Sequence, residues 1–297
     1  MITQPQADQA MLDAERHVLR AEFQQAMEAF ARARLFFHKT GDRDGEAIAM
    51  LRTGELELGQ GHTLRARDAL FEALALFTEE AEDSDCSAAE VLLSEALHLD
   101  GESDKAMRHA EAALARAEKA GNLYGEARAY MQMGRIDLDA GRSDLALERL
   151  GHARRLYEEA GNGLHEATAL SAMAGVLRDT GRPDAAHEAL EQAADLYAMN
   201  GDHLDEATTR MDIGRLLATL GARDDAREAF SVAARLNGEA GHLAGEAEAL
   251  LEAGRLEARE APKRALKLLR HAADLFGHAG LDVRRAQAER EAAGLRA

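Results

Sequence analysis

Apolar residues recur along most of the chain at the three- to four-residue spacing of amphipathic helices, and glycines interrupt this pattern at regular intervals. The glycines form two series that share a period of 40 residues. The first series is Gly41, Gly121, Gly161, Gly201 and Gly241, with Ala81 in the missing position and Gly280 one residue early, and the second is Gly61, Gly101, Gly141, Gly181 and Gly221. Glycine is favoured just after a helix because it adopts the left-handed backbone conformation without a steric cost. The pattern therefore predicts two helices per period, each ended by a glycine turn.

Small residues also repeat inside the predicted helices. The first helix of each period carries Gly54, Ser94, Gly134, Ala174, Gly214 and Gly254, and the second carries Ala26, Ala66, Ala106, Ala146, Ala186, Ala226 and Ala265. A larger residue follows in the second helix as Phe30, Leu70, Leu150, Leu190, Phe230 and Leu269, with Ala110 as the exception. A glycine inside a helix costs about 1 kcal/mol relative to alanine. Its recurrence predicts that neighbouring helices cross closely at this position, with the larger residues filling the adjacent space.

The period divides the chain into seven predicted helical hairpins and one last helix. The hairpins cover about 5–41, 42–81, 82–121, 122–161, 162–201, 202–241 and 242–280, and a charged capping helix covers 281–296. We expect one continuous domain over 1–297, without a separate globular domain. The third hairpin opens with the acidic stretch EEAEDSDCSAAE in place of the usual glycine phrase. This departure indicates either neutral sequence drift at a helix start or a more flexible connection between hairpins at 82–90.

The repeated residues resemble the tetratricopeptide repeat (TPR) family. Tyr130, Met133-Gly134, Ala146, Leu150 and Ala153 match its pattern in order, whereas Asp137 stands where the family has tyrosine and the final proline is missing. The 40-residue length is similar to the extended-repeat subclass of LGN/Pins-like scaffolds and MalT-like helical arrays. The resemblance implies an all-α, right-handed α-solenoid whose first helices line a concave groove that binds proteins or peptides.

Composition and charge narrow the function. The chain has three prolines and no tryptophan, and few β-branched residues, which favours an all-α fold. A net charge of −18 argues against general binding to nucleic acid or to an anionic membrane, because such binding neutralises phosphates with basic residues. One cysteine excludes an internal disulfide framework. We expect a cytoplasmic protein, and the excess of arginine over lysine points to a bacterial source.

No motif in the sequence assembles a catalytic or metal site. Cys86 lies among acidic residues, which disfavour the thiolate. Glu95 and His98 have the spacing of a di-iron motif, but no second such pair accompanies them, and His271 with His278 lacks a third ligand. We therefore expect a protein that is not an enzyme and has no cofactor and no metal.

The candidate binding residues follow from counting along each first helix from its glycine. The positions that the TPR family turns into its groove carry Arg128, Met131, Arg135, Leu138, Arg178, Met211, Arg215, Leu251 and Arg255. Guanidinium groups bind carboxylates through paired hydrogen bonds, and methionine adapts to apolar partners. These residues predict a ligand with acidic and apolar side chains. In the alternative interpretation, the arginines pair with Asp139, Asp179 and nearby glutamates and form an ordinary solvated surface.

Three functions stay open at this point. The first is an adaptor or scaffold that binds a protein or an acidic peptide. The second is a sensor whose solenoid changes shape when it binds a small peptide, with the segment 82–90 as its hinge. The third is a self-assembling array that stacks through the apolar residues Leu35, Phe36 and Phe37. We expect a monomer or a weak homo-oligomer.

Overall fold

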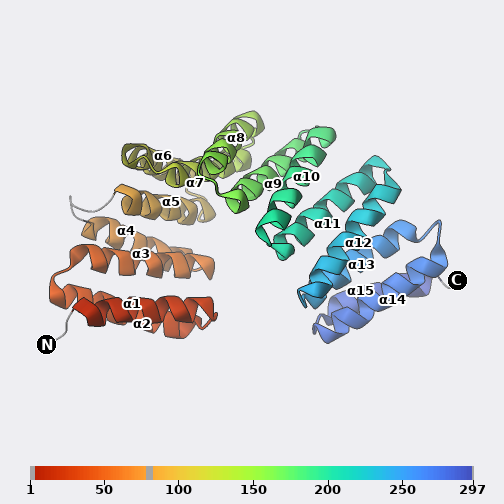
Figure 1. Cartoon of the computed structure of the whole chain (residues 1–297), viewed down its shortest axis with the longest axis horizontal. Helices are drawn as coiled ribbons and strands as arrows, with labels where there is room; N and C mark the ends of the chain where they lie inside the picture. The colour runs from red at the N-terminus through yellow and green to blue at the C-terminus, as the bar shows by residue number, and fades with distance from the viewer. Residues whose placement is uncertain (1–3, 78–82, 296–297) are drawn as a thin grey trace. The chain divides into compact units, whose positions relative to one another are not determined.

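The computed structural model describes residues 4–77 and 83–295, and the regular structure in these ranges consists of 15 α-helices without a strand (Figure 1). The chain divides into two compact units between Ala160 and Gly161. The first unit holds α1 (Gln4–Leu19), α2 (Phe23–Thr40), α3 (Arg43–Gly59), α4 (Thr63–Leu76), α5 (Asp83–Leu99), α6 (Ser103–Ala120), α7 (Leu123–Asp139) and α8 (Ser143–Glu159). The second unit holds α9 (Gly163–Asp179), α10 (Pro183–Asn200), α11 (His203–Leu220), α12 (Arg223–Glu239), α13 (Leu243–Glu257), α14 (Pro262–His278) and α15 (Asp282–Gly294).

Each unit is a stack of helical hairpins. The two helices of a hairpin pack together most extensively, and the second helix then packs against the first helix of the next hairpin. First helices of successive hairpins also touch one another, as α3 with α5, α5 with α7 and α11 with α13. Helix α15 packs against α14 at the end of the second unit. The predicted all-α solenoid of stacked hairpins is confirmed.

The structure bears on the predicted boundaries only in part. The predicted hairpin boundary at 81 and 82, the position of Ala81 and the last predicted helical residue, 296, lie outside the described residues. That all the hairpins form a single continuous domain stays a prediction.

The turns between helices have the predicted left-handed geometry. Every glycine of both series has a positive φ, between 64° and 83°. The first turn has the equivalent conformation without glycine, because Ala21 occupies it with a φ of 55°. A left-handed conformation costs a residue with a Cβ roughly 1–2 kcal/mol. The acids that follow the second glycine series, such as Asp104 and Asp224, lie in the first turns of their helices, where they face the positive end of the helix dipole.

Close helix crossings explain the repeated small residues. A Cβ added to Gly54 would lie 2.6 Å from Leu70 Cγ, and one added to Gly214 would lie 2.5 Å from the ring of Phe230. The seven repeated alanines of the second helices are fully buried: Ala26, Ala66, Ala106, Ala146, Ala186, Ala226 and Ala265 are each 0% exposed. The small residues thus let the helices approach, and the larger ones fill the space beside them, as predicted.

Asp137, which replaces the tyrosine of the TPR pattern, is a buried charge with two partners. Its side chain is 1% exposed, and its carboxylate lies 2.7 Å from Arg142 and 2.5 Å from Arg149, which both belong to the following turn and helix. A buried carboxylate needs such partners because burial removes its hydration. The ion pairs therefore join α7 to the start and the middle of α8.

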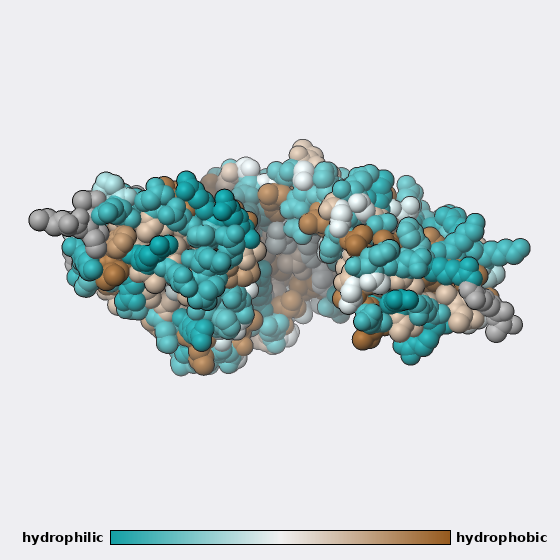
Figure 2. All heavy atoms as spheres, turned by 90° about the horizontal axis from the view of Figure 1, so that it is seen from below, coloured by the Kyte–Doolittle hydropathy of each residue, from teal (hydrophilic) through white to brown (hydrophobic). Residues whose placement is uncertain are grey.

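The surface is largely polar. On the face drawn in Figure 2, hydrophilic residues cover most of the area and hydrophobic residues form small separate patches. The most exposed of the large apolar residues are Leu19, Leu64, Leu99, Met199 and Val283. Among the described helices, none combines the length and the hydropathy needed to cross a membrane.

Candidate functional site

The predicted binding residues of the first unit all lie on α7. Arg128 lies over the ring of Tyr124, 6.0 Å from its centroid, and Arg135 is half-exposed with Glu95 at 3.6 Å. Leu138 is 37% exposed, whereas Met131 is 7% exposed and belongs to the core. An exposed pair at 3.6 Å contributes little energy, so Arg135 keeps most of its capacity to bind another carboxylate.

The predicted residues of the second unit lie on α9, α11 and α13. Arg178 on α9 is exposed and pairs with its neighbour Asp179 at 2.9 Å, as the solvated-surface interpretation predicts. Met211 on α11 and Leu251 on α13 are 6% and 0% exposed, so both are core residues in this structure. Arg215 and Arg255, by contrast, line one pocket.

This pocket, which we call the arginine pocket, has a volume of about 490 Å³ and opens between the hairpin α11–α12 and helix α13. Four of its lining residues are arginines and one is an acid. The lining residues are Arg215, Ala218, Thr219, Arg223, Phe230, Glu252, Arg255, Leu256, Ala258 and Arg259. The lining of this pocket thus has more basic than acidic side chains, although the whole chain has a net charge of −18. Its volume is in the usual range for ligand pockets.

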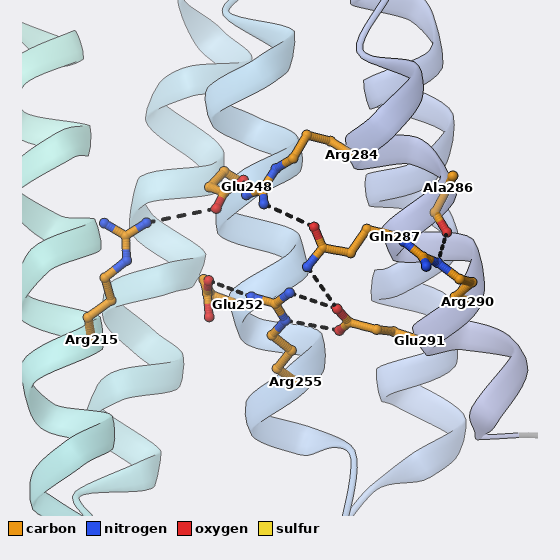
Figure 3. Close-up of polar contacts among 9 residues, drawn as sticks. All are labelled: Arg215, Glu248, Glu252, Arg255, Arg284, Ala286, Gln287, Arg290 and Glu291. Carbon is orange, nitrogen blue, oxygen red and sulfur yellow. Dashed lines mark hydrogen bonds and ion pairs between the residues drawn. The ribbon is translucent and has the colours of Figure 1, made fainter.

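Arg255 is fixed in place by two acids (Figure 3). Its Nη1 donates to Glu252 at 2.9 Å, and its Nε and Nη2 donate to the two carboxylate oxygens of Glu291 on α15, at 2.9 and 2.7 Å. The hydrogen bond to Glu291 is the main reason that the pKa of Arg255 is raised, and it lowers the pKa of Glu291 in turn. Arg255 therefore forms a rigid wall of the pocket, and its charge is largely compensated.

Arg215 is held more loosely. Its guanidinium lies 3.2 Å from Asp212 and 3.9 Å from Glu248, and half of the side chain is exposed. Figure 3 shows it extending from α11 toward Glu248 on α13, which also accepts a hydrogen bond from Arg284. Because Glu248 has this second partner, Arg215 can exchange its weak contact for a ligand carboxylate.

The other two arginines of the pocket were not among the predicted residues. Arg223 is the first residue of α12; its Nη2 donates to the carbonyl of Leu256, and its Nε lies 3.0 Å from Glu260. Arg259 follows the end of α13 and is exposed, and it forms no ion pair or side-chain hydrogen bond with another described residue. Counting from the first-helix glycine missed both, because they lie at the turns between helices. An available signal was that Arg223 stands where the other hairpins have Phe23, Thr63, Ser103, Ser143 and Pro183.

The residues considered for chemistry are engaged in structural contacts. Cys86 is buried, and burial raises the pKa of its thiol, so its reactive thiolate is disfavoured. His98 pairs with Asp139 at 2.8 Å, and Glu95 faces Arg135 instead of His98. Within residues 4–77 and 83–295, no group of three or more His, Cys, Asp or Glu side chains is placed to hold a metal ion.

The unusual entry of the third hairpin is a regular helix start over its described residues. Within the predicted segment 82–90, position 82 lies outside the described residues and α5 begins at Asp83. Asp83 lies 2.6 Å from Lys119, Ser87 donates to the carbonyl of Ala113 at 2.9 Å, and Glu90 lies 2.6 Å from His109. These contacts tie the segment to α6. That it acts as a hinge stays a prediction.

Comparison with known proteins bears directly on the repeat. The family model described as tetratricopeptide repeat matches residues 125–199 and again, shifted by one period of 40 residues, residues 165–239. Residues 125–239 are therefore similar to tetratricopeptide repeats. No curated protein sequence matches the chain. The extended-repeat subclass suggested by the 40-residue period stays a prediction.

Solved structures with TPR-like folds resemble the chain over almost its whole length. The apo form of RapI matches 98% of this chain and 97% of its own, with a TM-score of 0.64 and 14% identity. A Rap protein in complex with competence and sporulation factor matches 97% of this chain and 73% of its own, with a TM-score of 0.65 and 18% identity. A signal transduction ATPase with a tetratricopeptide repeat sensor, from Pyrococcus horikoshii, matches 97% of this chain and 47% of its own, with a TM-score of 0.66 and 14% identity. At these identities the likeness concerns the fold.

Proposed function

We propose that the protein is a non-catalytic TPR module that binds an acidic and partly apolar segment of a protein or peptide, and that the arginine pocket of the second unit is its main contact. Such repeats bind proteins and peptides on their helical surfaces. The Rap protein crystallised with competence and sporulation factor has a similar fold, and its complex supports a binding role for this chain. A cytoplasmic location and a bacterial source belong to the same proposal.

The observation that carries the proposal is the excess of arginines over acids in one pocket. Arg255 and Arg223 are fixed by neighbours, so they offer a preorganised wall, while Arg215 and Arg259 keep unpaired donors for a ligand. Leu256 and the alanines between them provide apolar surface, over a floor formed by Phe230. Guanidinium groups in a partly enclosed site bind carboxylates more strongly than they do in open solvent.

The test measures the binding of a labelled synthetic peptide of glutamate and leucine residues by fluorescence anisotropy. Arg215→Ala together with Arg259→Ala is expected to weaken binding at least tenfold, since a hydrogen bond to a charged group contributes about 1.5–3 kcal/mol. A peptide with glutamine in place of each glutamate is expected to lose affinity to a similar degree.

Arg235→Ala serves as the matched control, because Arg235 is an exposed arginine of α12 that pairs with Glu239 and does not line the pocket. Equal binding by the double variant and the unchanged protein, or equal binding of the two peptides, would contradict the proposal.

The shape-changing sensor remains the second candidate, and one comparison favours it. The similar chain from Pyrococcus horikoshii is described as carrying a tetratricopeptide repeat sensor. The two candidates share the pocket and differ in what binding does. Small-angle scattering with and without a peptide that binds would separate them, since an adaptor keeps its scattering profile and a sensor changes it.

A further inference from the structure

The first unit has a pocket at the same position of the repeat, with the opposite character. This second pocket, which we call the apolar pocket, has a volume of about 510 Å³ and opens between the hairpin α1–α2 and helix α3. It is lined by Glu15, Val18, Leu19, Phe23, Phe30, Arg52, Glu55, Leu56 and Gly59. Leu19 is 87% exposed, Phe23 43% and Val18 37%. Exposed apolar side chains gathered in one concave site mark a binding surface more often than single ones do.

The backbone next to these exposed side chains is held in a closed turn and is not a frayed helix end. The turn after Leu19 is closed by hydrogen bonds from Ala21 N to Val18 O and from Glu22 N to His17 O, both 2.9 Å long. The side chains of His17 and Glu22 close the same turn at 2.6 Å. The backbone at Leu19 is therefore ordered, and a partner that covers this residue does not have to order the turn first.

The charges on the walls specify the partner further. Arg52 and Glu55 pair with each other at 2.8 Å along α3 and so compensate each other. Glu15 on α1 is exposed and lines the pocket, and it forms no ion pair or side-chain hydrogen bond with another described residue. A cation placed there would gain an uncompensated acid as its partner.

We infer that the apolar pocket is a second binding site, for a peptide segment of a partner protein in which an aliphatic side chain stands next to a lysine or arginine. The aliphatic side chain enters between Leu19, Phe23 and Leu56, and the basic residue pairs with Glu15. This site has the opposite charge preference to the arginine pocket. The inference does not depend on the function proposed for that pocket.

The test uses a labelled synthetic peptide of leucine and lysine residues, with fluorescence anisotropy as the readout. Leu19→Ser with Phe23→Ser is expected to weaken binding by tenfold or more, because two apolar contacts are lost. Glu15→Gln is expected to weaken it severalfold, and this effect is expected to disappear for a peptide with glutamine in place of lysine. Leu64→Ser removes another largely exposed leucine of the same unit, outside the pocket, and is expected to leave binding unchanged.

Each alternative occupant gives a distinct outcome. Binding that salt abolishes and that neither Leu19→Ser nor Glu15→Gln changes would mean that the peptide binds the acidic surface as a whole, which overturns the inference. A dimer in sedimentation that Leu19→Ser converts to monomer would assign the pocket to a second copy of this chain and overturn it as well. Arg215→Ala with Arg259→Ala is expected to leave the leucine–lysine peptide bound, so the failure of one proposal is distinguishable from the failure of the other.

Discussion

The arginine pocket and the apolar pocket occupy the same position of the repeat and have different linings. Glu15 and Arg215 stand 200 positions apart, which is five periods of 40 residues, and the other lining residues correspond in the same way, except that Ala258 has no counterpart in the lining of the apolar pocket. Two apolar positions are shared, Phe30 with Phe230 and Leu56 with Leu256. Three charged positions have opposite signs: Glu15 and Arg215, Arg52 and Glu252, Glu55 and Arg255.

The remaining differences concern the turns. Phe23, Leu19 and Gly59 of the apolar pocket correspond to Arg223, Thr219 and Arg259 of the arginine pocket. The helices and the floor are thus common to both pockets, and the pockets differ in the side chains on their rims. A solenoid can change the specificity of one hairpin in this way without disturbing the helix packing of the others.

Substitutions of the two phenylalanines that form the pocket floors are expected to have the largest effects on stability. Phe30 and Phe230 are each 2% exposed, so Phe30→Ala and Phe230→Ala are each expected to lower the free energy of unfolding by about 3–5 kcal/mol. Urea unfolding followed by circular dichroism measures both. A large loss for one variant and almost none for the other would show that the two floors are not equivalent.

A smaller effect distinguishes how the helices cross in the two units. A Cβ added to Gly214 would lie 2.5 Å from the ring of Phe230. The equivalent residue of the first unit, Ala14, already carries a methyl group and packs in one cluster with Phe30. Gly214→Ala is expected to destabilise the second unit by about 1–3 kcal/mol through overpacking. Gly175→Ala is the control, because a Cβ added to this helical glycine would meet no neighbouring side chain within 4 Å. It is expected to raise the thermal midpoint, since alanine favours the helix by about 1 kcal/mol relative to glycine. A Gly214→Ala variant as stable as the control would remove this difference between the units.

The equivalent turns of the two pockets predict a reciprocal pair of changes. Ala21 has a φ of 55° and Gly221 a φ of 81°, at the same position of the repeat. Ala21→Gly is expected to stabilise the protein by about 1 kcal/mol, and Gly221→Ala to destabilise it by about the same amount, because only glycine adopts this conformation without strain. Differential scanning calorimetry measures both shifts. Shifts of the same sign would contradict the strain argument.

The smallest predicted effect is a difference in pH dependence between the two pocket walls. The pKa of Glu291 is lowered from its usual 4.5, first by its hydrogen bond with Arg255. A lowered pKa in the folded state means that the stabilisation is complete above about pH 4.5 and is lost as the pH falls through the folded pKa. Because the pair is partly exposed, Glu291→Gln is expected to cost only about 0.5 kcal/mol at neutral pH and nothing at low pH.

Glu55→Gln, in the exposed pair of the apolar pocket, is the matched comparison. It is expected to have a smaller effect in the same urea titrations at neutral pH. A cost of Glu291→Gln that persists at low pH would show that the contribution of Glu291 does not come from its charge.

Some of the site was predictable and some was not, for a physical reason in each case. Periodicity along the first helices predicted that Arg215 and Arg255 face the same way, because a helix repeats its facing direction every few residues, and both line the arginine pocket. That they bind a ligand stays a prediction. Periodicity does not show how deeply a side chain is buried, so Met211 and Leu251 were assigned to the same surface although both are buried. It could not identify Arg223 and Arg259, whose positions depend on how a turn folds back over the next helix.

The sequence by itself determined the helices, their glycine turns and their close crossings, since these follow from local backbone preferences and residue size repeated along the chain. Only the tertiary structure decided which charges compensate each other and which stay open to a ligand. Arg255 is engaged by Glu291, 36 positions away on another helix, whereas Arg259 has no such partner in the described part of the chain. Ion pairing depends on distances between side chains of different helices, and the one-dimensional repeat does not contain those distances.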